Sequence, residues 1–576
     1  MTGIHNISIH SLKIETSVRS VYSVVKNAIL ILFLLSNAIA YSQNIPYENA
    51  VVSSANELAS EVGIKILKSG GNAIDAAVGT AFALAVVYPQ AGNLGGGGFI
   101  VLHTEKGFET SIDFRETAPL LSSKNMYLDN NGNVISELST TGQLASGIPG
   151  SVAGLLFALE KYGTKSREEI LSYAIDLAEK GFHINKELAH SFNYHRSDFN
   201  QFVSSSKVFG KKFSEGILFV QTDLANTLKE ISAKGRDGFY KGTVADKIVA
   251  EMKNGNGIIS LSDLENYKPV ERNVIKGTYR GYDIITMGSP SSGGTCLIYL
   301  LNILENFDLK SLGKGSFHFV NILAEAMKRV YSDRSEFMGD KDFYNMPVDK
   351  LISKSYAWER FENFKLGESI SSTEIKPGNA DKESPQTTHL SAADAKGNMV
   401  SLTTTLNDVF GSKVVVDGAG FLLNNEMDDF SVKPGVPNIY GLVGNEANSI
   451  QPGKRMLSSM TPTIILKDNK PFLVIGSPGG GKIITAVLQS IINVIDFDMS
   501  VENAVDAPRF HHQWLPDLLQ LENSYASNMV IRELKEIGYT VKIISDFARV
   551  EAIKFNPDGT LTGHSDRRGS GKALGF

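Results

Sequence analysis

A polar segment divides this chain into two parts, and the second part begins with the pattern of a β-hairpin. Residues 363–386 are mostly polar and hold few large apolar side chains, so they have little with which to anchor themselves in a core. Residues 387–394 and 398–407 then show two strand patterns around a tight turn, with Gly397 at the position that requires a positive φ. The fold must therefore start a strand at the end of a loosely held polar stretch.

The turn sets the register of this hairpin. A loop over residues 395–397 places Asp394 opposite Asn398. Continuing the same ladder places Thr387 opposite Thr405, so that two hydroxyl groups lie side by side. A slip of one residue would turn Thr405 to the other face of the sheet. The β propensity of threonine is another explanation of this Thr-rich pattern, because it favours strands whatever the chemistry.

The dipeptide Thr387-Thr388 is a candidate site of internal cleavage. A cut before Thr387 would expose this threonine as a new N-terminus. A threonine hydroxyl is a poor nucleophile at neutral pH, and a free α-amine on the same residue supplies a base for its proton. That amine titrates near pH ~8, so it can act without burial or a metal ion. The alternative is an ordinary Ser/Thr-rich loop leading into a strand, since short motifs often match by chance.

The composition restricts the class of protein. A chain of 576 residues that is 42% hydrophobic and 20% charged predicts one large, closely packed unit or two lobes. A net charge of -6 without a run of Lys or Arg argues against nucleic-acid binding and favours small-molecule partners. Cys296 is the only cysteine, which excludes an intramolecular disulfide, and the eleven histidines lack metal-binding spacing. We expect no metal and no cofactor.

The N-terminus has the pattern of an export signal. Basic residues precede the apolar core at 28–35, and Ala38 and Ala40 suit cleavage after residue 40. Eight apolar residues are too few to span a bilayer, so we expect no stable membrane span. We therefore expect residues 1–40 to be a signal peptide and the protein to be periplasmic or secreted. The long basic region also leaves an uncleaved anchor open.

Apolar residues at helical spacing dominate the first half of the chain, and strand patterns are more frequent in the second half. We expect helices over residues 57–71, 73–86, 151–161, 168–180, 243–254, 315–333, 483–496 and 528–537. We expect strands within 92–103, 461–467 and 471–475, and a closing hairpin through 556–559. Strands and helices in blocks indicate an α+β fold with helix-covered sheets. A four-layer αββα sandwich would place Thr387 at a strand start between its two sheets.

A glycine-rich turn at 476–483 follows one strand pattern and precedes a helix pattern, which is also the context of a nucleotide-binding P-loop. Ile483 stands where that motif needs Ser or Thr to hold magnesium. Glycine amides at a helix N-terminus can also point at a developing negative oxygen. Gly479 and Gly480 are therefore candidates for an oxyanion hole, and a tight turn that simply needs glycine is the alternative.

The chain resembles the γ-glutamyltranspeptidase family, and the resemblance covers almost the whole chain after the signal. Its most specific motifs are Gln-Thr-Thr-His at 386–389 and Gly-Ser-Pro-Gly-Gly at 476–480. The other segments that carry it are residues 113–119, 405–407, 423–430, 433–444, 457–463 and 507–514. The family belongs to the N-terminal nucleophile hydrolases, so the resemblance also implies the αββα sandwich.

The resemblance implies a precursor that cuts itself between Gln386 and Thr387. It leaves a large subunit, residues 41–386, and a small catalytic subunit, residues 387–576, which stay together as a heterodimer. Thr387 then attacks a γ-glutamyl carbonyl and forms an acyl-enzyme, with its own amine as base. Thr405 is carried over as the hydrogen-bonding partner of Thr387, and the oxyanion donors map to the amides of Gly479 and Gly480.

The resemblance also assigns the substrate contacts, and they agree with the charges of a γ-glutamyl group, which carries one carboxylate and one ammonium. The carboxylate side is matched by Arg115, Ser458 and Ser459, and the amine side by Asn407, Glu426 and Asp429. Tyr440 lies in residues 433–444, which resemble the lid loop of some members. Some of these residues also have a structural alternative. Arg115 would pair with Asp113 or Glu116, Ser458 and Ser459 would form a turn, and the acidic pair at 428–429 would face solvent.

Three functions follow from these residues. The first is transfer of a γ-glutamyl group from glutathione or a related amide to water, an amino acid or a peptide. The second is a related acylase for glutaryl or poly-γ-glutamyl substrates, which would not need the amine-binding residues. The third is an exported solute-binding protein without turnover, which would remain a single uncut chain. An ATPase ranks last and would depend on Lys482.

Overall fold

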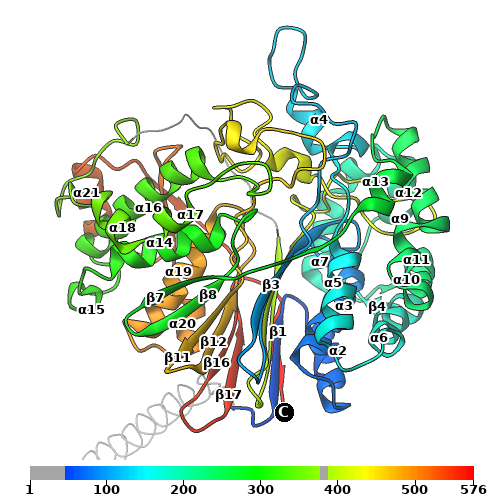
Figure 1. Ribbon diagram of the computed structural model, residues 1–576, viewed down its shortest axis with the longest axis horizontal. Coiled ribbons are helices and arrows are strands. Elements are labelled where there is room, and N and C mark those ends of the chain that lie inside the picture. Colours follow the sequence, from blue (N-terminus) through cyan, green and yellow to red (C-terminus); the bar gives the residue numbers. More distant parts are fainter. Residues whose placement is uncertain (1–45, 376–386, 546) are drawn as a thin grey trace, which may run out of the picture. The chain divides into compact units, whose positions relative to one another are not determined.

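Two antiparallel sheets lie face to face at the centre of the computed structural model, and each carries helices on its outer side (Figure 1). The structure describes residues 46–375, 387–545 and 547–576. The helices α2, α3 and α5 cover one sheet, and the helices α14, α19 and α20 cover the other. These layers confirm the αββα architecture that the sequence predicts.

The two sheets combine strands from distant parts of the chain. The first sheet has seven strands in the order β18 (Lys572–Gly575), β1 (Ala50–Ser54), β9 (Thr388–Asp394), β10 (Met399–Thr405), β2 (Gly97–His103), β3 (Glu109–Asp113) and β6 (Val270–Arg272). The second has six, in the order β17 (Leu561–Ser565), β16 (Glu551–Phe555), β12 (Lys470–Gly476), β11 (Thr463–Lys467), β8 (Tyr282–Thr286) and β7 (Ile275–Tyr279). A small three-stranded sheet contains β13 (Phe510–His511), β14 (Leu519–Glu522) and β15 (Val541–Ile544). A two-stranded sheet contains β4 (Phe182–His183) and β5 (Leu218–Phe219).

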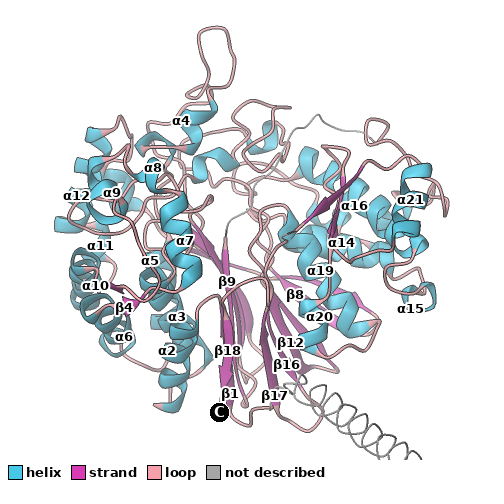
Figure 2. Ribbon diagram, turned by 180° about the vertical axis from the view of Figure 1, so that it is seen from behind, coloured by secondary structure: helices cyan, strands magenta, loops and turns pink. Residues whose placement is uncertain are grey.

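Helices form the outer layers (Figure 2). Those on the side of the first sheet are α2 (Glu57–Lys68), α3 (Ala73–Val87), α4 (Ser136–Thr140), α5 (Ser151–Tyr162), α6 (Arg167–Lys180), α7 (Lys186–Tyr194), α8 (Arg196–Phe199), α9 (Val203–Phe209), α10 (Thr222–Lys234), α11 (Asp237–Tyr240), α12 (Gly242–Asn254) and α13 (Leu261–Asn266). Those on the side of the second are α14 (Gly293–Leu304), α15 (Leu309–Leu312), α16 (Phe317–Phe337), α17 (Val348–Leu351), α18 (Lys354–Glu359), α19 (Lys482–Ile495), α20 (Val501–Asp506) and α21 (Asn528–Glu536).

The hairpin of β9 and β10 lies in the interior of the sandwich, with every residue of both strands buried. Side chains of a strand alternate between its two faces. Leu390 and Ala392 pack into the apolar core with α3, whereas His389 and Ser391 face the second sheet. There the ring of His389 lies against Gly476, and the Ser391 hydroxyl donates to the carbonyl of Glu551. Odd-numbered residues of β9 therefore point between the sheets.

The eight predicted helices are all present, and their ends differ from the prediction by a few residues. The predicted strands near 92–103, 461–467 and 471–475 correspond to β2, β11 and β12. The first half is mainly helical, as predicted, and it also contains strands that the sequence did not indicate, among them β1, β7 and β8. β1 is buried on both faces and shows no alternation of polar and apolar residues, so its pattern gives little signal.

Two predictions lie outside the described residues, namely the signal peptide at 1–40 and the residue Gln386 before the expected cut. Within the described part of the chain, no helix is both long and apolar enough to cross a membrane.

Candidate active site

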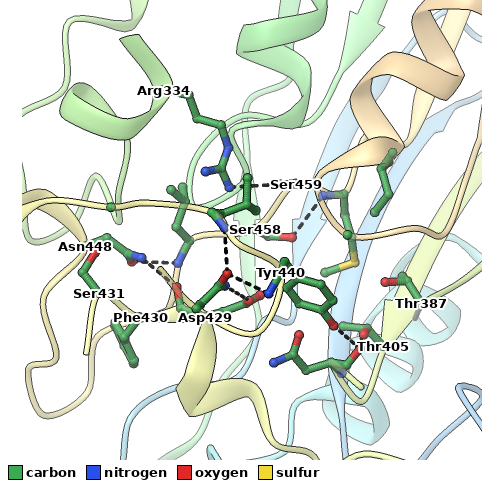
Figure 3. Close-up of a pocket in the computed structure, with 18 of the residues that line it drawn as sticks. Arg334, Thr387, Thr405, Asp429, Phe430, Ser431, Tyr440, Asn448, Ser458 and Ser459 are labelled. Atoms are coloured by element: carbon green, nitrogen blue, oxygen red, sulfur yellow. Dashed lines mark hydrogen bonds between the residues drawn. The ribbon is translucent and has the colours of Figure 1, made fainter. Parts of the chain in front are cut away.

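β9 and β10 pair in the register that the sequence predicts. Thr388 is the partner of Thr404, so Thr387, the residue before β9, lies across from Thr405 at the end of β10. Both Thr387 and Thr405 line the same pocket, and Thr387 is 7% exposed (Figure 3). Because strand residues alternate, Thr387 shares the face of His389 and points between the sheets. The hairpin thus delivers two hydroxyl groups to one pocket.

The turn after β10 directs a third polar group into this pocket. The hydroxyl oxygen of Thr405 accepts a hydrogen bond from the amide of Asn407 at 2.7 Å. Asn407 has a φ of 76°, in the left-handed region that Asn tolerates better than most residues. Its side-chain amide donates to the carbonyl of Asn425 at 3.0 Å. Thr405 therefore holds the turn that places Asn407 in the wall of the pocket.

The glycine turn between β12 and α19 reaches the pocket from the second sheet. Gly479 has a φ of 133° and Gly480 a φ of 55°, and both values favour glycine. Gly480 lines the pocket, and Gly479 packs against Ala548 just behind it. Within residues 387–545, 547–576 and 46–375, no acceptor is bonded to the amide of either glycine. The amide of Gly480 is therefore an unused donor in the wall of the pocket that Thr387 also lines.

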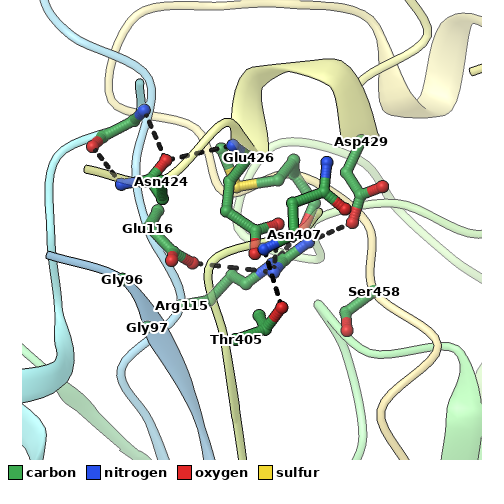
Figure 4. A network of polar contacts seen from close by, with 12 residues as sticks. Gly96, Gly97, Arg115, Glu116, Thr405, Asn407, Asn424, Glu426, Asp429 and Ser458 are labelled. Atoms are coloured by element: carbon green, nitrogen blue, oxygen red, sulfur yellow. Dashed lines mark hydrogen bonds and ion pairs between the residues drawn. The ribbon is translucent and has the colours of Figure 1, made fainter. Parts of the chain in front are cut away.

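Arg115 lines the pocket within a cluster of carboxylates and lies close to Thr405 (Figure 4). Its guanidinium contacts Glu426 at 2.6 Å and Asp429 at 2.5 Å, and Glu116 lies 3.6 Å away. Arg115 is completely buried, and so are Glu116 and Glu426. It does not pair with Asp113, whose carboxylate contacts other arginines instead. These are Arg272 at 2.7 Å and Arg455 at 3.3 Å.

The cluster contains more acidic than basic groups, and burial changes their ionisation. Burial raises the pKa of Glu116 to about 8, although Arg115 opposes the shift. Burial also raises the pKa of Glu426 and of Asp429, again against the effect of Arg115. A cationic group entering this end of the pocket would be attracted to the carboxylates and would favour their charged forms. The cluster is therefore suited to a substrate ammonium group.

Two serines form the wall between this cluster and α16. Hydrogen bonds hold Ser458 against the loop between β8 and α14. The hydroxyl of Ser459 accepts a hydrogen bond from Arg334 at 2.9 Å. The same guanidinium donates to Ser292 at 2.8 Å. Arg334 lines the pocket and was missed by the sequence reasoning, which ended the helix at residue 333. A basic residue in a last helical turn is usually explained by the helix dipole, so the sequence held no specific signal.

The loop at 433–444 closes over the pocket. Tyr440 is 4% exposed, and its hydroxyl donates to the carbonyl of Asn407. Its ring packs on Gly480, where any side chain would collide with it. Asn438 of the same loop donates to Asp429 at 3.0 Å. This loop thus contacts both the glycine turn and the acidic cluster.

Most of the predicted site residues therefore meet in one narrow pocket, with a cavity volume of about 30 Å³. The predicted residues that line it are Arg115, Thr387, Thr405, Asn407, Asp429, Tyr440, Ser458, Ser459 and Gly480. Glu426 and Gly479 do not line it. Glu426 is fully buried against Arg115, and Gly479 packs against Ala548. A threonine hydroxyl, a backbone amide and a cluster of charged groups around one pocket suit acyl transfer from an amino-acid-like substrate.

Comparisons with known proteins agree with this arrangement. The family model of γ-glutamyltranspeptidase matches residues 59–576. The glutathione hydrolase proenzyme of Escherichia coli (strain K12) is 47% identical over 526 residues, which cover 90% of each protein. A solved γ-glutamyltranspeptidase chain of Helicobacter pylori is 50% identical with a TM-score of 0.56, and the match covers 56% of this chain and 94% of that one. A cephalosporin acylase from Bacillus halodurans has a TM-score of 0.83 at 27% identity, covering 92% and 96%. The chain belongs to the γ-glutamyltranspeptidase family.

Proposed function

We propose that this protein is a self-cutting enzyme that removes the γ-glutamyl group of glutathione and related amides and transfers it to water, an amino acid or a peptide. The observation that carries the proposal is the position of Thr387 at the start of a strand. It lies in a pocket that is also lined by Gly480 and by the ion pair of Arg115 with Asp429. The name of the E. coli relative supports the same donor.

The proposed cut lies between Gln386 and Thr387. It gives a large part, residues 41–386, and a small part, residues 387–576, that remain associated. Association after the cut is supported by the sheets, since β1 pairs with β9 and β18, and β2 pairs with β10. The H. pylori chain also supports two parts, because 94% of it matches only 56% of this chain.

In the proposed mechanism the α-amine of Thr387 accepts the proton of its own hydroxyl as the oxygen attacks the γ-carbonyl. The amides of Gly479 and Gly480 stabilise the oxyanion, a contribution that typically reaches ~3 to 4 kcal/mol for one well-placed donor. The tetrahedral intermediate releases an amine, which takes the proton, and leaves an ester on Thr387. Water or another amine then attacks the ester along the same path. No cofactor takes part in this mechanism.

The proposed contacts of the γ-glutamyl group follow the charges of the pocket. Its carboxylate faces Arg115, Ser458 and Ser459, while Arg334 holds the second serine in place. Its ammonium faces Asn407 and Asp429. Glu426 contributes its charge through Arg115, because it does not line the pocket. We propose that Tyr440 closes the site and excludes water from the acyl-enzyme, as lids over reactive intermediates do.

An acylase acting on substrates without an α-amine is a second candidate, and the fold of the cephalosporin acylase favours it. The acidic cluster argues against it, because a glutaryl group carries a carboxylate and no ammonium, which would leave Arg115 as the only cation beside three buried carboxylates. The two candidates are distinguished by comparing γ-glutamyl and glutaryl derivatives of the same amine. A higher kcat/KM for the glutaryl derivative would favour the acylase.

We also propose export through residues 1–40, with cleavage after Ala40. N-terminal sequencing of the large part recovered from the culture medium or periplasm tests this position. Recovery of the large part in the cytoplasm with its first residues intact would contradict export.

The decisive experiment for the function is the intact mass of the purified protein combined with a glutathione assay. Two chains, one starting at Thr387, and release of glutamate from glutathione are the expected results. A fully active protein that remains a single chain would refute the self-cutting mechanism. An uncut protein that releases no glutamate would instead leave the exported binding protein and the ATPase to be tested with labelled ligands.

A further inference from the structure

The segment at 507–514 carries part of the family resemblance, and the proposed mechanism gives it no role. Residues 511–514 lie at the end of β13 and directly after it, and all four are at most 3% exposed. They are two histidines, a glutamine and a tryptophan, whose polar atoms need partners once they are buried. The partners of residues 511–514 therefore show what this segment holds in place.

Gln513 contacts the loop at 433–444. Its side-chain nitrogen Nε2 donates to the carbonyl oxygens of Tyr440 and Gly441, both at 3.3 Å. An amide nitrogen carries two protons, so one side chain can bond two carbonyls. Among the described residues, neither carbonyl has another hydrogen-bond partner. Gln513 is therefore the residue that attaches the backbone of this loop at Tyr440.

These contacts fix the orientation of the Gln513 amide. Because Nε2 faces two carbonyls, Oε1 faces His511 and accepts a hydrogen bond from Nε2 of that ring at 2.9 Å. A neutral ring then carries its proton on Nε2, which leaves Nδ1 to accept from the hydroxyl of Thr485 at 2.9 Å. The opposite orientation would place Oε1 against two oxygen acceptors. A chain of hydrogen bonds thus runs from Thr485 to the loop.

This chain joins the loop to the helix that follows the glycine turn. Thr485 lies in the first turn of α19, which begins two residues after Gly480. The ring of Tyr440 packs on Gly480, and its hydroxyl donates to the carbonyl of Asn407. Tyr440 is therefore attached at both ends, its hydroxyl to Asn407 and its backbone to Gln513. Both attachments keep its ring in the wall of the pocket that Thr387 lines.

The backbone that carries Gln513 is itself well fixed. The indole nitrogen of Trp514 donates to the carbonyls of Ser372 and Ile375, both at 2.8 Å. The backbone amide of Trp514 donates to the ring of His512 at 3.1 Å. Residues 433–444, in contrast, contain no helix or strand. A side chain on a fixed backbone thus holds a loop that has little regular structure of its own.

We propose that Gln513 is a positioning residue whose amide holds the backbone of residues 440–441, keeps the ring of Tyr440 on Gly480 and so limits the access of water to the acyl-enzyme. The effect on water rests on the proposed function. The attachment of the loop does not, and it can be tested without turnover. Gln513 acts only through the loop, because it does not line the pocket.

The first experiment is limited digestion of the purified protein by chymotrypsin, which cuts after large apolar and aromatic residues. Tyr440 is 4% exposed, so cleavage there requires the loop to open, and its rate follows the open population. Gln513→Met keeps the length of the side chain and removes its donor. We expect cleavage after Tyr440 or Leu442 to become about fivefold faster or more, as loss of a buried hydrogen bond predicts. Mass spectrometry of the fragments identifies the cut.

Gln489→Met is the matched control. Gln489 of α19 is 4% exposed, and its amide nitrogen donates to the carbonyls of Thr485 and Phe510 at 2.8 and 2.7 Å. The substitution removes the same kind of buried donor beside the same strand, β13, without touching the loop. We expect cleavage after Tyr440 to keep the wild-type rate. An equal rise in both variants would assign the effect to loosening around β13 and would overturn the inference.

The second experiment follows the acyl-enzyme, with γ-glutamyl-4-nitroanilide as donor and a fixed concentration of glycylglycine. We expect the hydrolysed fraction to rise in Gln513→Met and to stay unchanged in Gln489→Met, because a loop that opens more often admits more water. Faster cleavage without a larger hydrolysed fraction would confine Gln513 to holding the loop and overturn its effect on water.

Each remaining outcome is decisive. An unchanged rate of cleavage after Tyr440 in Gln513→Met overturns the inference and leaves the proposed function intact. If this variant does not fold, Gln513→Asn replaces it. Its amide is one methylene shorter and cannot reach the carbonyls, so the same rise is expected and its absence overturns the inference. A wild-type protein that releases no 4-nitroaniline refutes the proposed function, and the digestion still decides whether Gln513 holds the loop.

Discussion

The hydroxyl of Tyr440 donates a hydrogen bond to the backbone carbonyl of Asn407, which joins residues 433–444 to the turn held by Thr405. Asn407 and Tyr440 both line the active-site pocket. The ring of Tyr440 also packs on Gly480, so this one side chain connects the turn after β10 with the glycine turn before α19.

Replacing Thr387 by alanine is expected to abolish both the internal cut and turnover, because the same hydroxyl serves both reactions. Intact mass spectrometry should give one chain. The matched control is Thr388→Val, since Thr388 is the next residue and points to the opposite face of β9. A cut and active Thr387→Ala protein would contradict the assignment.

Thr405→Val should lower kcat/KM while leaving the fold intact. The valine removes the acceptor of the Asn407 amide, and an unsatisfied buried donor costs ~1 to 3 kcal/mol, which corresponds to about five- to 150-fold. Thr405→Ser retains the hydroxyl and should restore most of the rate. Circular dichroism checks the fold, and equal loss in the serine variant would show that packing matters instead.

Asp429→Asn should raise the KM for γ-glutamyl donors and leave the internal cut unaffected. Losing one charge-assisted contact to the ammonium group costs ~1.5 to 3 kcal/mol, or about 10- to 150-fold. A glutaryl donor, which lacks that ammonium, is the control substrate and should not show the loss. Similar losses with both donors would indicate that Asp429 acts by holding Arg115 in place.

Tyr440→Phe should shift the enzyme toward hydrolysis. The substitution keeps the ring on Gly480 but removes the hydrogen bond to Asn407, which typically contributes ~0.5 to 1.5 kcal/mol. A lid that opens more often admits more water to the acyl-enzyme. The hydrolysed fraction at a fixed acceptor concentration measures the effect, and a lower fraction would refute a water-excluding role.

The buried carboxyl group of Glu551 should make stability depend on pH. Burial raises its pKa to about 8, above the ordinary value of 4.5. Its stabilising effect is therefore complete below pH ~4.5 and is lost as pH rises through ~8. The free energy of unfolding in urea should fall between pH 5 and 8 by up to a few kcal/mol from this group, with the order of magnitude set by the pKa difference.

Glu551→Gln tests this dependence. The amide stays neutral and can still bond Ser53 and Ser565, which contact the carboxylate at 2.6 and 2.9 Å. The slope of stability against pH should therefore flatten in this variant. Glu536→Gln is the control, since Glu536 is 66% exposed, and an equally flat slope there would assign the effect to other groups.

The sequence was most informative where a local rule determines geometry. The turn at Gly397 fixed the ladder of β9 and β10, and alternation along the strands then determined which face Thr387 and Thr405 share. Gly479 and Gly480 were identifiable because a strand-to-helix turn with positive φ favours glycine. The roles of the charged residues came from family resemblance, because no local rule pairs residues hundreds of positions apart.

The sequence was least informative about long-range contacts. Arg115 meets Glu426 and Asp429 only after β3 and the 3-10 turn at Glu426–Asp429 come together in the fold. Arg334 reaches Ser459 from the far end of α16, with nothing in either segment to mark the pair. Strands such as β1 carry no alternating pattern, since both of their faces are buried.

The strand order of the first sheet also determines when the chain can be cut during folding. β1, β2 and β3 come from the part before Thr387, and they interleave with β9, β10 and β18 from the part after it. Two separately synthesised pieces would each present open, apolar strand edges and would face a bimolecular search before any edge was covered. Severing the chain is harmless only once both sheets are complete, so the uncut polypeptide serves as the template for its own assembly.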